Sequence, residues 1–204
     1  MQVNIFYSWQ SDLPDSTNRI FIENCLEKAK EILSIDDTFS LELRIDMDTK
    51  GISFSPDVMS TVFAKIEASQ IFVADITLIN RRCAKNSKNQ IRRTPNPNVL
   101  VELGYAAALL GWNNVILVYN TAYGEIEELP FDLRGRKPLT YHLNSDEDKT
   151  EKEKYLIEAF ASAFQEQREL FKNHPMTKLY RFCESKFFWI RWEVEVLVLN
   201  MRKV

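Results

Sequence analysis

One glutamate stands in the middle of an otherwise apolar helix that the sequence predicts to begin at Asn96. Asn96 is a good N-cap residue, and Pro97 suits the first helical position, whose N–H has no intrahelical partner. Asn98, Glu102 and Tyr105 follow at spacings i, i+4 and i+7, which places them on one face of the helix. A carboxylate held in such a setting can stabilise a developing positive charge or act as a nucleophile. We therefore expect this polar stripe to face a cleft.

The same three side chains also have structural explanations that the pattern leaves open. Glu102 could cap a neighbouring backbone segment or pair with an arginine across the helix. Asn98 is equally suited to ordinary hydrogen bonding at a helix start. Tyr105 is of a residue type that is more often packed in a core than placed against a ligand.

The surrounding pattern predicts an α/β fold with a doubly wound, mostly parallel, five-stranded sheet flanked by helices. Continuous apolar runs typical of strands covered on both faces alternate with helical segments, which favours right-handed βαβ units. The expected strands cover residues 3–7, 41–45, 71–74, 115–118 and, more weakly, 139–141. Besides the Glu102 helix, the expected helices cover residues 18–33, 55–68 and 147–171.

Three of these strands end in polar residues, namely Ser8, Asp46 and Asp75. In an open parallel sheet a ligand binds beyond the carboxyl ends of the strands. Each residue alone is weak evidence, because strand ends are where polar residues belong. Together with the Glu102 helix they define one candidate crevice. Trp9, just past the first strand, could stack on a base or pack against the following helix.

Composition narrows the possible partners. The chain has 204 residues, 45% of them hydrophobic, and a formal net charge of −3. This balance argues against stable nucleic acid binding, which needs a broadly positive surface. The N-terminus lacks a basic start and a long apolar run, so we expect a cytoplasmic protein without a membrane role.

Metal and disulfide chemistry is not supported by the sequence. The sequence has three cysteines, an odd number, and they are widely spaced with no Cys-x-x-Cys pair: Cys25, Cys83 and Cys183. The acidic loop 46–51 lacks the further ligands of a calcium loop. We therefore predict no bound metal.

Two further segments are distinctive. The loop 81–93 holds six basic and no acidic residues, which indicates either a solvated loop or one that attracts phosphate or a partner. Residues 187–199 are aromatic and β-branched, yet too short and too charged to span a bilayer. We expect a domain over residues 1–172 and a helical or extended appendage over 173–204, which could mediate oligomerisation or link to a further domain.

Several motifs resemble those of bacterial TIR-like domains. The opening motif Phe-Tyr-Ser-Trp-Gln-Ser-Asp at residues 6–12 and the segment 55–77 are similar to that family. The most specific match is Asn-Pro-Asn-Val-Leu-Val-Glu-Leu-Gly-Tyr-Ala at 96–106, which resembles the signature of predicted nucleotide-binding proteins in antiphage defence. Leu-Pro-Phe-Asp-Leu-Arg at 129–134 also fits. The resemblance covers roughly the first 165 residues.

This resemblance implies a TIR or flavodoxin-like sheet and an enzyme that cleaves NAD⁺ between nicotinamide and ribose, with NAD⁺ as substrate rather than cofactor. By motif position, Glu102 is the essential carboxylate. Tyr7, Ser8 and Trp9, with the loop containing Asp48 and Phe54, would flank the nucleotide. It further implies activation by homo-oligomerisation or by a partner protein.

The helix motif is also similar to the nucleophile helix of nucleoside 2-deoxyribosyltransferases. Nicotinamide leaves NAD⁺ as a neutral molecule, so a single carboxylate is chemically enough, whereas ordinary glycosidases need a second carboxyl group as acid. A purine leaving a nucleoside would benefit from protonation, for which Asp75 or Asp46 could serve. A third interpretation is a nucleotide-sensing or assembly module in which Glu102 only recognises ribose hydroxyls.

Overall fold

The computed structural model describes residues 2–35, 41–47, 58–80, 93–145 and 148–173. Asp48, Phe54, most of the basic loop and the segment 187–199 lie outside these residues. The strands are β1 (Gln2–Ser8), β2 (Glu42–Asp46), β3 (Ile71–Asp75), β4 (Val115–Asn120) and β5 (Leu139–Tyr141). The α-helices are α1 (Arg19–Ile35), α2 (Val58–Glu67), α3 (Pro97–Leu110), α4 (Phe131–Arg134) and α5 (Thr150–Asn173), with short 3₁₀ turns at Trp112–Asn114, Thr121–Tyr123 and Ile126–Glu128.

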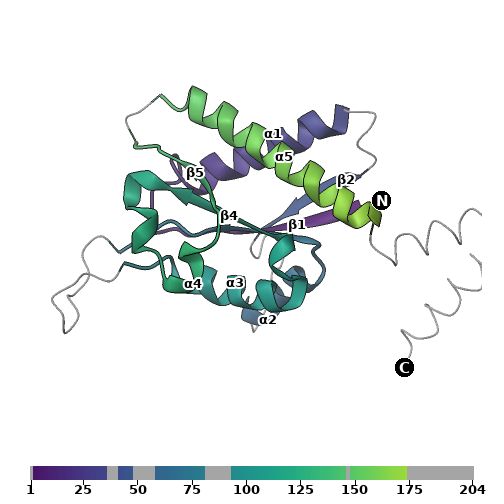
Figure 1. Ribbon diagram of the computed structural model, residues 1–204, viewed down its shortest axis with the longest axis horizontal. Helices are drawn as coiled ribbons and strands as arrows, with labels where there is room; N and C mark the ends of the chain where they lie inside the picture. Colours follow the sequence, from purple (N-terminus) through teal and green to yellow (C-terminus); the bar gives the residue numbers. More distant parts are fainter. Residues whose placement is uncertain (1, 36–40, 48–57, 81–92, 146–147, 174–204) are drawn as a thin grey trace, which may run out of the picture. The chain divides into compact units, whose positions relative to one another are not determined.

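The five strands form one parallel sheet in the order β2-β1-β3-β4-β5. The sheet confirms the predicted fold class. Helix α1 leads from β1 outward to β2, whereas α2 leads back across β1 to β3. Because crossovers between parallel strands are right-handed, α1 lies on one face of the sheet and α2 on the other, beside α3 (Figure 1). The reversal of strand order makes β1 and β3 the switch point, where ligands bind in such sheets.

Burial explains why these segments are strands. All five residues of β3 are buried, as are five of the six residues of β4, which is the pattern of central strands covered on both faces. The register pairs Phe6 with Asp46 and Ser8 with Ala74, so the carboxyl ends of β2, β1 and β3 lie at the same edge. The polar residues that end these strands therefore gather there, as the sequence predicts.

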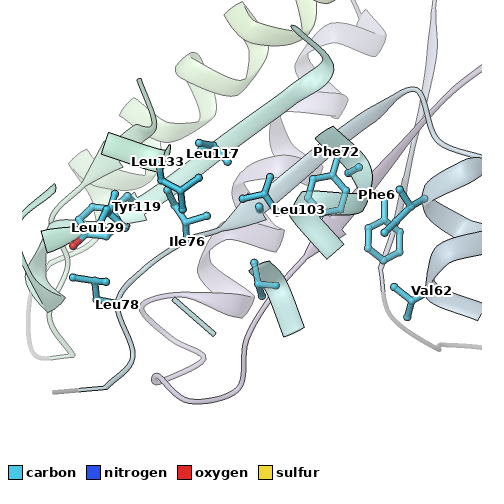
Figure 2. Close-up of a cluster of buried hydrophobic side chains, with 14 residues drawn as sticks. Phe6, Val62, Phe72, Ile76, Leu78, Leu103, Leu117, Tyr119, Leu129 and Leu133 are labelled. Atoms are coloured by element: carbon cyan, nitrogen blue, oxygen red, sulfur yellow. The ribbon is translucent and has the colours of Figure 1, made fainter. Parts of the chain in front are cut away.

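A hydrophobic cluster fills the space between the sheet and the α2–α3 layer (Figure 2). Phe6 of β1 stacks on Phe72 of β3 with ring centroids 5.9 Å apart and planes 12° apart. Val99 and Leu103, on the buried face of α3, pack in the same cluster. Burying side chains of this size contributes about 1.5–3 kcal/mol each, so the cluster fixes α3 firmly on the sheet.

The chain divides into two compact units, Met1–Ala163 and Phe164–Val204, and all five strands belong to the first. This division falls within α5. The predicted boundary at 172/173 stays a prediction, since the structure describes the second unit only as far as residue 173. Within the described ranges, no helix is long and apolar enough to cross a membrane.

Candidate active site

A cavity of about 420 Å³ opens at the carboxyl end of β1, between that strand and the first turns of α2 and α3. Its size falls in the range of small-molecule sites. Among the described residues, the lining is Phe6, Tyr7, Ser8, Trp9, Gln10, Ser11, Val58, Met59, Val62, Asn96, Asn98 and Glu102. The cavity thus lies at the switch point of the sheet and combines an apolar wall from α2 with hydroxyl, amide and carboxylate groups.

Glu102 meets Ser8 inside this cavity. The Ser8 hydroxyl donates a hydrogen bond of 2.5 Å to Oε2 of Glu102. Ser8 is 1% exposed, while Glu102 is half-buried. A short bond of this kind, between a hydroxyl and a carboxylate, is among the stronger hydrogen bonds in proteins. It fixes one carboxylate oxygen of Glu102 at the cavity wall.

The first turn of α3 forms a second part of the wall. Asn96 is the N-cap, because its Oδ1 accepts hydrogen bonds from the backbone N–H groups of Asn98 at 2.8 Å and Val99 at 3.4 Å. Pro97 occupies the first helical position, as predicted. The exposed Asn98 side chain lies one turn before Glu102, and both residues line the cavity. The expected stripe therefore faces the cavity at two of its three positions.

Tyr7 and Ser8 point to opposite faces of the sheet, because successive side chains of a strand alternate. Ser8 faces α3. The Tyr7 side chain is fully buried, and its hydroxyl donates a long hydrogen bond of 3.5 Å to the carbonyl oxygen of Arg19, at the start of α1. Burial, aided by the charge of Asp75, raises the pKa of the Tyr7 phenol well above its ordinary value. The Tyr7 hydroxyl thus points toward α1, while Tyr7 remains among the residues that line the cavity.

Trp9 forms the edge of the cavity beyond β1. The guanidinium carbon of Arg19 lies 3.5 Å from the centroid of the Trp9 ring. This cation–π contact holds the indole at the cavity edge. Trp9 therefore does pack against the helix that follows it, which was one of the two predicted roles, and it also lines the cavity.

Asp75 lies at the end of β3 but does not line the cavity. Its side chain is completely buried and accepts hydrogen bonds from Gln10, Asn18 and Thr77. Burial raises the pKa of the Asp75 carboxyl, and the hydrogen bonds from these three residues oppose that rise. The expectation that Asp75 faces the crevice is thus corrected: the carboxylate is held inside a polar network.

This network extends beneath the carboxyl edge of the sheet. Asn120, at the end of β4, donates to the Asn18 side chain at 3.3 Å and to the carbonyl oxygen of Leu143 at 2.9 Å. The Tyr141 hydroxyl donates to the carbonyl oxygen of Thr17 at 2.7 Å. Since these groups are buried and mutually bonded, the network rigidifies the loop between β1 and α1.

Two other predicted residues lie away from the cavity lining. Asp46 ends β2 and forms an ion pair with Lys65 of α2, with 2.8 Å between Oδ1 and Nζ. Tyr105 stacks on Phe63 with centroids 4.2 Å apart, and its hydroxyl donates to Glu67. A helix rises 1.5 Å per residue, so Tyr105 lies about 10 Å along α3 from Asn98, where α2 rather than the cavity covers the helix.

Sequence reasoning did not single out Gln10, Ser11, Val58 and Met59, all of which line the cavity. The position of Gln10 and Ser11 directly after the first strand was a usable signal. Val58 and Met59 have no such signal, because only the packing of α2 beside α3 brings them to the site.

A comparison with models of known families shows which family the sequence belongs to. A model described as "CAP12/Pycsar effector protein, TIR domain" matches residues 19–143, more than half of the chain. No curated protein matches. Among solved structures, a "2-desoxiribosyltransferase from Leishmania mexicana" is similar at 15% identity and a TM-score of 0.40, covering 76% of this chain and 97% of that one.

Proposed function

The chain belongs to the TIR-domain family of the CAP12/Pycsar effector proteins, and from this premise we propose that it cleaves the bond between nicotinamide and ribose in NAD⁺. The family supports the coarser statement that this is a TIR-like defence effector. The observation that carries the finer proposal is the hydrogen bond from Ser8 to Glu102 within the cavity at the switch point.

The reaction needs little beyond one well-placed carboxylate. When the glycosidic bond breaks, its electron pair moves to the ring nitrogen of nicotinamide, which leaves as a neutral molecule. The anomeric carbon becomes part of an oxocarbenium ion, and Glu102 stabilises that positive charge. Water then forms the new bond to carbon and releases a proton, giving ADP-ribose. Capture by the adenine base instead gives a cyclic product.

The surrounding residues support this assignment. Ser8 holds the carboxylate of Glu102 in one orientation, and the exposed Asn98 offers an amide group suited to ribose hydroxyls. The half-buried Trp9 ring and the apolar residues Val58 and Met59 suit a flat aromatic group. Asp46 and Asp75, the acids that base exchange on nucleosides would use, are bound to Lys65 and to the polar network instead.

The test is an incubation of the purified full chain with NAD⁺ and, separately, with a deoxynucleoside and a free base. We expect nicotinamide and ADP-ribose, or its cyclic form, in the first reaction. Exchange of bases in the second reaction without cleavage of NAD⁺ would overturn the proposal. So would tight binding of NAD⁺ that survives prolonged incubation intact under any activating condition, high protein concentration included.

We propose further that the active form is a homo-oligomer or a complex with an activating partner, as an NAD⁺-consuming enzyme must be restrained in its host. Self-assembly predicts that nicotinamide release per molecule rises with protein concentration. A specific activity that stays constant over a wide concentration range, with a constant sedimentation coefficient, would contradict self-assembly.

A further inference from the structure

Asn96 uses both ends of its side-chain amide. The Oδ1 atom caps α3 by accepting from the N–H groups of Asn98 and Val99. The Nδ2 group donates a hydrogen bond of 2.6 Å to Oδ2 of Asp12, in the loop between β1 and α1. A helix cap requires only the oxygen. The second bond therefore has a separate consequence, which is to tie the start of α3 to the loop that follows Ser8.

Asp12, which accepts this hydrogen bond, is itself held in place. Gln10 Oε1 accepts hydrogen bonds from the backbone N–H of Asp12 at 2.6 Å and of Leu13 at 2.9 Å. Gln10 Nε2 donates to the buried carboxylate of Asp75 at 3.2 Å. Gln10 is itself 2% exposed. The loop at Asp12 is thus held to the end of β3, so it forms a fixed point for α3.

The hydrogen bond between Asn96 and Asp12 joins the two sides of the cavity that hold the residues of the proposed reaction. Ser8, Gln10 and Ser11 line one side of the cavity, and Asn96 and Glu102 line the other. Glu102 lies six residues after Asn96 on the same helix. A shift of the start of α3 would therefore move the Glu102 carboxylate relative to Ser8.

We propose that Asn96 and Asp12 are positioning residues whose hydrogen bond, the Asn96–Asp12 link, sets the placement of Glu102 in the cavity. This inference rests on the proposed NAD⁺ cleavage for its effect on rate, but not for the existence of the link. A displacement of about 1 Å at a reacting group can lower a rate by about a hundredfold. Loss of the link should therefore lower kcat more than it raises KM.

The chain offers a test by exchange of the two residues. In Asn96→Asp the cap is retained, because Asp caps helices as well as Asn does, but two carboxylates now face each other. In Asp12→Asn a neutral amide pair can still form one hydrogen bond. In the double variant, the amide introduced at position 12 can donate to the carboxylate introduced at position 96, which restores the link with reversed polarity.

We expect Asn96→Asp to lower kcat about tenfold or more, Asp12→Asn to lower it less, and the double variant to recover most of the loss. Asp12→Ala removes the link without adding repulsion and should also lower kcat. A double variant as slow as Asn96→Asp, or an Asn96→Asp variant within about twofold of the wild type, would overturn the proposal.

A second readout does not depend on catalysis. Asn96 Nδ2 donates one of its two protons to Asp12, so the resonance of that proton should move upfield in the NMR spectrum of Asp12→Ala. If the wild type cleaves no NAD⁺ but Asp12→Ala produces this shift, the proposed function fails and the link stands. An unchanged resonance in Asp12→Ala would refute the link itself.

Discussion

The hydroxyl of Ser8 and the carboxylate of Glu102 lie 2.5 Å apart although 94 positions separate them in the sequence. Ser8 ends the strand at the switch point of the sheet, and Glu102 projects from the helix that covers the same face. Their contact turns a carboxylate on an apolar helix into an oriented group at the wall of a cavity.

Replacing Ser8 with Ala should lower the rate of nicotinamide release about 10- to 100-fold, because a hydrogen bond to a charged group contributes about 1.5–3 kcal/mol. The rate with saturating NAD⁺ measures this directly. Ser34→Ala, at the exposed end of α1, is the matched control and should behave as wild type. Equal rates in the two variants would argue against a role for Ser8 in orienting Glu102.

Replacing Trp9 with Ala should raise KM for NAD⁺ about tenfold, whereas Trp9→Phe, which keeps an aromatic ring, should stay within a few-fold of wild type. Trp112→Ala is the control, since Trp112 also stacks with an arginine, Arg136, at 3.8 Å but lies outside the cavity lining. A KM unchanged in Trp9→Ala would remove this side chain from the substrate site.

The buried carboxyl of Asp75 predicts a pH-dependent stability. Burial raises its pKa in the folded protein above the value of 3.8 that an ordinary carboxyl has. Between 3.8 and the raised pKa the folded state binds more protons than the unfolded state, so the free energy of unfolding falls as pH rises through that window. The comparison is urea unfolding of wild type and Asp75→Asn from about pH 4 to about pH 7.

In that comparison, the wild type should lose stability relative to Asp75→Asn as pH rises. The slope is the informative quantity, since the substitution also alters hydrogen bonds and therefore the absolute stability. A difference that is flat, or that grows in favour of the wild type with rising pH, would mean that the pKa of Asp75 is not raised.

Cys25 should be inert in the folded protein. Burial, with the nearby charge of Glu153, raises the pKa of its thiol to about 12, so almost no thiolate forms near neutral pH. In a chain carrying Cys83→Ser and Cys183→Ser, alkylation by iodoacetamide should be far slower in buffer than in denaturant. Similar rates under both conditions would contradict the burial of Cys25.

Local signals in the sequence were enough to predict the helices and strands and to single out the carboxylate of Glu102. The Asn-Pro start of α3 is a capping pattern that depends on adjacent residues only, and it is confirmed by the bonds that Asn96 makes. Continuous apolar runs at β3 and β4 predicted parallel strands, because both faces of these strands are covered. Ser8 was predicted to follow the first strand directly, and it is the last residue of β1.

What could not be predicted depends on contacts between distant residues. Asp75 ends a strand as Ser8 does, yet its carboxylate accepts hydrogen bonds from Gln10 and Asn18, which lie far from it in the sequence. Tyr105 shares a helical stripe with Asn98, but Phe63 of α2 occupies its face. The polarity of a strand end or a helix stripe identifies candidate residues, whereas the packing of neighbouring helices decides which of them reach the cavity.

The central claim is that Glu102 promotes cleavage of the bond between nicotinamide and ribose, and one comparison tests it most directly. Nicotinamide release from NAD⁺ should be measured by chromatography for wild type, Glu102→Gln and Glu127→Gln, the last being an exposed control outside the cavity lining. Gln keeps the size of Glu, and its one oxygen can still accept a hydrogen bond from Ser8, so the variant removes the negative charge and exchanges the other oxygen for an NH₂ group. We predict at least about a hundredfold loss for Glu102→Gln and none for Glu127→Gln. Full activity in Glu102→Gln would contradict this account.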